Sequence, residues 1–148
     1  MSLREQMILT AKQWIKAHND RNATGEAGLT ALAAPDFVAR SFPSSLQAPD
    51  RNREEYAAFQ SWAFTLFDTY STTEVDMVVD ETQRKVVYYL NAKGTASAGE
   101  YNNEYIHKLT LTEDGKLLKE FDAFLDSQAM MTWMGKVHAA QGSKGEGK

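Results

Sequence analysis

The residues with the clearest capacity for chemistry lie in one strand-like segment, residues 101–111. Side chains alternate between the two sides of a β-strand, so every second residue shares a face. One face of this segment carries Tyr101, Asn103, Tyr105, His107, Leu109 and Leu111. Two phenols, an amide and an imidazole therefore adjoin an apolar end. This composition is typical of a strand that packs in the core at one end and lines a ligand pocket at the other.

The two tyrosines and the histidine are suited to acid–base chemistry. A phenol in a dry cavity donates a hydrogen bond to a carbonyl or to a developing enolate, and a neutral imidazole acts as a general base. Tyr101 and Tyr105 are about 13 Å apart along an extended strand, so we expect them to hold two ends of a polycyclic ligand. The alternatives are that both tyrosines expose their hydroxyls to solvent and that His107 is a satisfied core residue.

A second polar group is predicted on two other strands. Arg40 alternates with the apolar residues Val38 and Phe42, so we expect it to point inward. A buried arginine there needs an ionic partner or the oxygen atoms of a ligand. Glu120 and Asp122 share a face of a later strand and are candidates for a proton-carrying carboxylate. The alternative is a structural ion pair between Arg40 and one of these carboxylates.

Hydrophobic periodicity places these residues on an α+β framework. Helices are predicted over residues 2–18, 26–33, 52–67 with Tyr70 at the end, and about 126–138; strands are predicted over residues 36–42, 73–79, 85–96, 101–111 and 117–125. Helices followed by a meander of strands predict helices packed on one face of an antiparallel sheet, which would enclose a cone-shaped pocket when bent. The apolar wall is expected from Trp14, Phe59, Trp62 and Leu66, for which core filling is the alternative.

Composition excludes several classes of function. The formal charge of −4 and the lack of a basic, aromatic cluster disfavour nucleic-acid binding. The chain has no cysteine and three scattered histidines, so no metal site is predicted. No apolar run is long enough for a membrane span, and we see no signal peptide, so a cytoplasmic protein is expected. One domain over residues 1–140 and a flexible tail over residues 141–148 are predicted.

Several motifs resemble a known family over about residues 2–138. They are the order of elements, the Asn103-Glu104-Tyr105 strand, the Asp114-Gly115-Lys116 turn and the Phe124-Leu125-Asp126-Ser127 ending. Together they are similar to the SnoaL-like branch of the nuclear-transport-factor-2-like superfamily. The resemblance is closest to small cofactor-free isomerases and cyclases of fungal meroterpenoid and indole-alkaloid biosynthesis. It implies a cone fold, and it implies that no cofactor is needed.

The resemblance also implies a set of polar residues. In the similar alkaloid-rearranging enzymes, one arginine and two tyrosines four residues apart form this set, and Arg40, Tyr101 and Tyr105 match it. Those enzymes also use a glutamate on the last strand, where this chain has Ala123. We therefore expect a neighbouring carboxylate, Glu120 or Asp122, to take over the role of the acid, or the reaction to differ.

The combined expectation is an isomerase or cyclase without a cofactor, acting on a polycyclic natural-product intermediate. Arg40, Tyr101 and Tyr105 would polarise an oxygen, while Asp122, Glu120 or His107 moves a proton in a semipinacol shift, ring expansion or aldol-type closure. Asn103 and the apolar wall would bind the substrate. The alternatives are a dehydratase or hydrolase with the same pocket, and a non-catalytic binding or dimerisation domain. The open face of the sheet predicts a homodimer.

Overall fold

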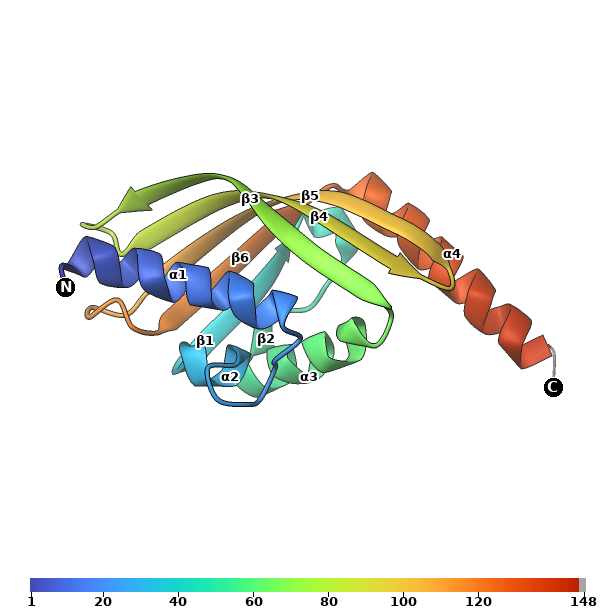
Figure 1. Cartoon of the computed structure of the whole chain (residues 1–148), viewed down its shortest axis with the longest axis horizontal. Helices are drawn as coiled ribbons and strands as arrows, with labels where there is room; N and C mark the ends of the chain where they lie inside the picture. Colours follow the sequence, from blue (N-terminus) through green and yellow to red (C-terminus); the bar gives the residue numbers. More distant parts are fainter. Residues whose placement is uncertain (147–148) are drawn as a thin grey trace.

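The computed structural model describes residues 1–146, which form one curved sheet with helices on its concave side and a long helix projecting from one end (Figure 1). The elements in chain order are α1 (Leu3–Asn19), α2 (Leu29–Leu32), β1 (Ala33–Phe42), the 3-10 turn η1 (Ser44–Leu46), β2 (Arg51–Asn52), α3 (Arg53–Phe64), β3 (Thr69–Asp80), β4 (Lys85–Ala96), β5 (Gly99–Leu111), β6 (Leu118–Leu125) and α4 (Ser127–Glu146). The predicted α+β arrangement is confirmed.

The sheet has six strands in the order β2-β1-β6-β5-β4-β3. Strands β3 to β6 form the predicted antiparallel meander. Strand β1 pairs in parallel with β6, which brings the first strand of the chain beside the last. This pairing places the candidate site residues of β5 and β6 next to β1 and, through β1, next to α3.

Capping residues fix the starts of two helices that cover the sheet. The Ser2 hydroxyl accepts a hydrogen bond from the Glu5 amide at 3.1 Å and begins α1. Asn52 and Glu55 form a complete capping box at the start of α3. Helix α1 then buries Met7, Ala11 and Trp14 against the sheet. These local signals, read correctly from the sequence, position the helices that close the cone.

The boundaries of several elements differ from the prediction. Helix α3 ends at Phe64, so Tyr70 lies in β3 rather than at the end of a helix. The β-branched run that starts at Thr69 favours a strand, and it pairs with β4 from its first residue. Gly94 on β4 makes room here, because a Cβ at that position would lie 2.7 Å from the Phe67 ring. The structure thereby adds Tyr70 to the inner face of the sheet.

Helix α2 begins at Leu29, later than predicted, and β1 begins at Ala33 and includes Pro35. Helix α4 is longer than predicted and continues to Glu146. Residues 141–146, expected to form part of a flexible tail, are therefore helical, and the rest of that predicted tail, residues 147–148, lies outside the described residues. The helix packs Trp133 and Val137 against Ala92 and Tyr101 in a buried apolar cluster.

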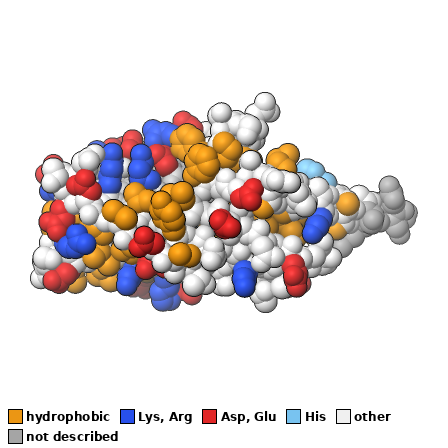
Figure 2. Space-filling view, turned by 90° about the horizontal axis from the view of Figure 1, so that it is seen from above, with side chains coloured by type: hydrophobic (Ala, Val, Ile, Leu, Met, Phe, Trp, Pro, Cys, Tyr) orange, Lys and Arg blue, Asp and Glu red, His pale blue; other side chains and the backbone are white. Residues whose placement is uncertain are grey.

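The outer face of the sheet carries apolar side chains among charged ones (Figure 2). Tyr89, Ile106 and Phe124 are neighbours on consecutive strands and are 47%, 39% and 51% exposed. Phe42 stacks on Phe124 with ring centroids 6.4 Å apart. The predicted homodimer would cover this face, and dimerisation stays a prediction. No described helix is both long and apolar enough to cross a membrane.

Candidate active site

The concave face of the sheet encloses a cavity of about 390 Å³ between β1, β5, β6, α3 and α4. Its polar lining comes from His18, Arg40, Ser41, Arg51, Tyr56, Gln60, Tyr70, Tyr101, Tyr105 and His107. Among the described residues, no aspartate or glutamate lines it. Apolar walls with a few convergent polar groups are typical of small-molecule sites. Any proton transfer inside this cavity therefore falls to a phenol or an imidazole.

Strand β5 presents the predicted polar face to the cavity. Tyr101, Tyr105 and His107 all line it, and Asn103 is buried beside them. Their spacing predicted that the two phenols would hold separate ends of a ligand, but the structure brings their hydroxyls together. Their hydroxyl oxygens lie 2.5 Å apart and share a hydrogen bond. Long side chains on a concave strand lean toward each other, so two residues far apart along the backbone converge on one point.

Asn103 fixes the direction of this hydrogen-bond chain. Its Oδ1 accepts from the backbone amides of Glu104 at 2.7 Å and Asp126 at 3.1 Å. The Nδ2 group must then face the Tyr101 hydroxyl, to which it donates at 2.8 Å. Asn103 does not line the cavity, in contrast to its predicted role in substrate binding. The structure makes it a positioning residue for Tyr101.

Burial governs the acidity of the phenols in this chain. Burial raises the pKa of Tyr105 well above its ordinary value, and its hydrogen bonds to Tyr101 and Tyr70 raise it further. Burial also raises the pKa of Tyr101, but its hydrogen bonds with Tyr105 and Asn103 oppose the rise. Tyr70, on β3, interacts with Tyr105 and also has a raised pKa because of burial. All three phenols are protonated at neutral pH, and the Tyr101 oxygen accepts a hydrogen bond from Asn103.

His107 lies one step deeper along β5. Burial lowers its pKa to about 3, and repulsion by His18 adds to the effect, so the imidazole is neutral at pH 7. The ring stacks on Tyr105 with centroids 5.4 Å apart. Its Nδ1 is buried and has no partner among the described residues. His107 lines the cavity, so its neutral imidazole is available to a ligand there as a weak base.

A second polar cluster on the cavity wall was missed in the sequence. The His18 Nδ1 lies 2.8 Å from the Trp14 carbonyl, so Nδ1 carries the proton and Nε2 accepts from the Tyr56 hydroxyl at 2.7 Å. Gln60 donates to the same hydroxyl at 3.1 Å. Burial lowers the pKa of His18 to about 4. The local sequence pattern carried no signal for this contact, because it joins α1 to α3.

Arg40 differs from its predicted orientation. The inward residues of β1 are Phe37 and Ala39, because the pairing with β6 sets Ala39 beside Phe121 and Arg40 beside Asp122. The Arg40 guanidinium lies 3.3 Å from Asp122, 3.6 Å from Glu120 and 3.9 Å from Asp50. Burial lowers the pKa of Arg40, but these carboxylates outweigh it and raise the pKa above the usual value.

The structural ion pair weighed as an alternative is therefore present. Asp122 also contacts Lys108, on the outer face of β5, at 3.5 Å. Arg40 borders the cavity, but Glu120 and Asp122 do not. The structure joins the predicted arginine and carboxylates to one another instead of to the tyrosines. A catalytic role for these three residues stays a prediction that this geometry disfavours.

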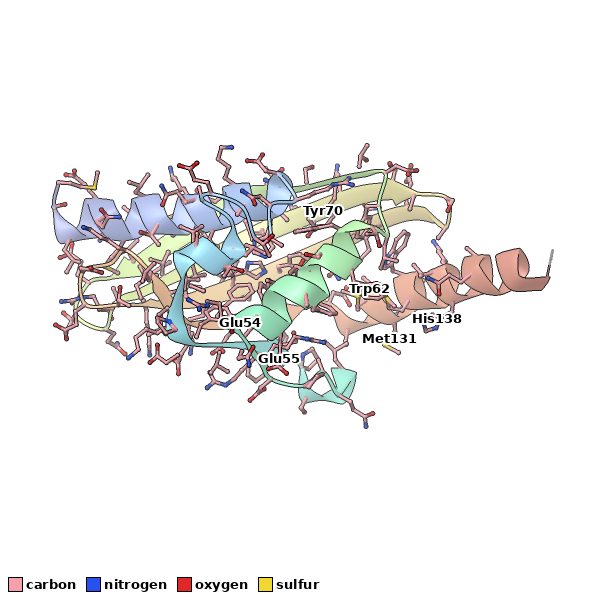
Figure 3. All side chains as sticks on the ribbon, turned by 90° about the horizontal axis from the view of Figure 1, so that it is seen from below. Glu54, Glu55, Trp62, Tyr70, Met131 and His138 are labelled. Atoms are coloured by element: carbon pink, nitrogen blue, oxygen red, sulfur yellow. The ribbon has the colours of Figure 1, made fainter. Side chains whose placement is uncertain are left out.

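The apolar wall is largely where it was expected. Phe59, Trp62 and Leu66 line the cavity, and contact between them and a substrate stays a prediction. Trp14 does not line it, because its ring is fully buried between Phe37, Tyr56 and Phe121. Helix α4 contributes Met130, Met131, Trp133 and Met134 to the opposite wall. Figure 3 shows Trp62 on α3 and Met131 on α4 near each other at this end of the molecule.

A second arginine, Arg51 on β2, lines the same cavity and was not singled out in the sequence. Its guanidinium carbon lies 3.8 Å from the centre of the Phe59 ring. Burial lowers its pKa. In the described part of the chain, no group of three or more His, Cys, Asp or Glu side chains is arranged to hold a metal ion.

Comparison with known proteins gives consistent results. The SnoaL-like domain family matches residues 11–120. The Austinoid biosynthesis cluster protein H of Aspergillus calidoustus is 31% identical over 140 residues, covering 92% of this chain and 93% of that protein. The Austinoid biosynthesis clusters protein S of Penicillium brasilianum is 26% identical over 147 residues, covering 97% of this chain and 99% of that protein.

Solved structures agree with this assignment. The BvnE pinacolase from Penicillium brevicompactum is 30% identical, with a TM-score of 0.85 over 93% of this chain and 94% of that chain. PrhC from Penicillium brasilianum, at 23% identity, has the same fold, with a TM-score of 0.87 over 97% of this chain and 95% of that chain. The chain therefore belongs to the SnoaL-like family, with the cone fold that its sequence motifs indicate.

Proposed function

We propose that the protein is an isomerase or cyclase of secondary metabolism that rearranges a polycyclic intermediate by acid–base catalysis without a cofactor. One observation carries the proposal: a mainly apolar cavity in which hydrogen-bonded phenols face neutral imidazoles and no carboxylate of the described residues takes part. The pinacolase among the similar structures and the austinoid-cluster relatives support this class of reaction.

The phenol chain would act on the oxygen that gains negative charge. Tyr105 lines the cavity and its hydroxyl is bonded to Tyr101, which Asn103 holds in place. A hydrogen bond from Tyr105 to a substrate carbonyl stabilises the alkoxide that develops there, and the mainly apolar lining of the cavity strengthens it. Tyr70, at the other side of Tyr105, can contribute a second donor.

His107 would take up the proton that the rearrangement releases. In an α-ketol type of semipinacol shift, a hydroxyl-bearing carbon loses its hydroxyl proton to the imidazole and becomes a carbonyl. One of its carbon substituents moves, with its bonding electrons, to the adjacent carbonyl carbon. The former carbonyl oxygen receives a proton through the phenol chain and becomes the new hydroxyl. One proton is taken up and one is delivered, so the product is an isomer of the substrate.

The proposal is tested by incubating the purified protein with a panel of polycyclic α-hydroxy ketones and following products by mass spectrometry and NMR. We expect a product of unchanged mass and altered carbon skeleton. Tyr105→Phe should lower kcat at least 100-fold, the lower range for loss of a positioned acid, with the fold retained by circular dichroism. A product lighter by one water would favour a dehydratase. Binding without conversion across the panel would favour the non-catalytic alternative.

A further inference from the structure

Arg51 stands out because it is a cation of the cavity wall that lacks an ionic partner. Among the described residues, the ion pairs found include three for Arg40 and one for Arg53, but none for Arg51. Burial lowers the pKa of Arg51 and outweighs the opposing electrostatic influence of Tyr56 and Glu55. No hydrogen bond of the Arg51 side chain was found in the same residues. Its charge is therefore left to be met by solvent or by a ligand.

The backbone and an aromatic ring hold this guanidinium at the cavity. Arg51 pairs with Ala39 across β1 and β2, and Ala39 is an inward-facing, buried residue that lines the cavity. Facing residues of paired strands share a side of the sheet, so Arg51 also points inward. The Phe59 ring lies against the guanidinium at 3.8 Å. Stacking on a ring leaves the N–H groups at the edge of the guanidinium available to an acceptor.

The charge balance of the lining indicates what that acceptor is. The cavity is lined by two arginines and, within the described chain, by no carboxylate. Arg40 is neutralised by the carboxylates that surround it, which leaves Arg51 as the uncompensated charge. A neutral ligand would leave a partly desolvated guanidinium unpaired, which is costly, whereas an anionic oxygen group would pair with it through two parallel hydrogen bonds.

We infer that Arg51 forms an anion-binding subsite of the cavity and that the natural ligand is a polycyclic molecule with an acidic group ionised at neutral pH, such as a carboxylate. This inference rests on the proposed function, because it assigns the class of substrate for the same cavity. The acidic group pairs with Arg51 on the β2 side, the ring system lies on Phe59 and the apolar wall, and the reacting oxygen reaches the tyrosines.

Two fluorescent dyes with the same aromatic skeleton test the subsite. Anilinonaphthalene sulfonate carries an anionic group, and phenylnaphthylamine is its neutral counterpart. Dissociation constants of both dyes are measured by fluorescence titration for the wild type, Arg51→Met and Arg53→Met. Met keeps an unbranched apolar stem against Phe59. Arg53, two residues away and paired with Glu54 at 2.8 Å, does not line the cavity, so its variant controls for net charge.

We expect Arg51→Met to weaken binding of the sulfonate dye about tenfold and binding of the neutral dye less than about twofold, the size expected for one charge-assisted pair. Arg53→Met should leave both constants within about twofold of the wild type. Arg51→Lys should fall between, because it keeps the charge but not the planar pair of donors. Circular dichroism confirms that each variant is folded.

The possible failures are distinguishable. Equal weakening of both dyes by Arg51→Met, or no change for either, contradicts the anion subsite while the apolar cavity remains. Equal effects of Arg53→Met and Arg51→Met attribute the preference to overall charge and also contradict it. If the wild type binds neither dye, both the subsite and the proposed function are contradicted.

Discussion

Two polar clusters of the same sheet differ in whether their side chains are charged or neutral. One is centred on the outer face, with Arg40 at the border of the cavity, and the other lies on the inner face. The cluster of the outer face, Arg40 with Asp50, Glu120 and Asp122, consists of charged groups that neutralise one another near solvent. The inner cluster, Asn103, Tyr101, Tyr105, Tyr70 and His107, is made of neutral groups whose pKa values burial displaces. Paired surface charges contribute little to the free energy of unfolding. Buried neutral donors and acceptors can strongly stabilise a charge that develops on a ligand.

The largest effect is expected from reversing one hydrogen bond of the inner cluster. In Asn103→Asp, the carboxylate still accepts from the Glu104 and Asp126 amides, but it can no longer donate to Tyr101. The pKa of Tyr101 should rise, because its hydroxyl now donates to the carboxylate. The kcat should fall about 10- to 100-fold, because that hydroxyl no longer donates to Tyr105. Absorbance titration of tyrosinate and the pH profile of kcat measure the two effects.

Asn102→Asp is the matched control for this variant. Asn102 is the next residue, exposed and on the other face of β5, and it carries the same change in charge. It should leave both the tyrosinate titration and the pH profile unchanged. If Asn103→Asp changed stability but neither of these readouts, Asn103 would have a structural role only.

The second effect concerns stability in acid. His18 and His107 have folded-state pKa values of about 4 and about 3, lowered by burial from 6.5, so the unfolded chain binds protons first as the pH falls. The free energy of unfolding should therefore be greatest above pH 6.5. Below it, each histidine should lower that free energy by about 1.4 kcal/mol per pH unit until its folded-state pKa is reached.

Urea denaturation at a series of pH values between neutrality and the onset of acid unfolding measures this slope. His107→Asn removes one of the two contributions and should make the slope about half as steep. His138→Gln, at an exposed position on α4, is the control for the loss of a histidine outside the cavity. An unchanged slope in His107→Asn would contradict the assignment of His107 as a buried neutral group.

The smallest effect is expected in the outer cluster. Asp122→Asn removes the contacts to Arg40 at 3.3 Å and to Lys108 at 3.5 Å, yet Arg40 keeps Glu120 and Asp50 nearby. We expect a loss of about 1 kcal/mol in the free energy of unfolding and a kcat within about twofold of the wild type. A loss of turnover comparable with that of Tyr105→Phe would show that the carboxylate acts in catalysis after all.

Local sequence patterns were sufficient to predict the order of the main helices and strands and the polar face of β5. Alternation along residues 101–111 identified Tyr101, Tyr105 and His107 as inward residues, and the Asn52–Glu55 pair marked the start of α3. These features depend on neighbours within a few residues of each other, where the period of two and the capping pattern leave little choice.

Which side chains contact one another depends on the pairing of segments that are far apart in the sequence. Strand β1 has apolar residues on both faces, so its alternation could not show that Arg40 faces outward; the register with β6 fixes that. The contact between His18 and Tyr56 joins two helices far apart in the sequence. Arg51 becomes a cavity residue only because a two-residue strand pairs with β1. Each of these outcomes depends on long-range pairing, which has no local pattern in the chain. Together they leave Glu120 and Asp122 in ion pairs with Arg40, and no carboxylate of the described residues lines the cavity.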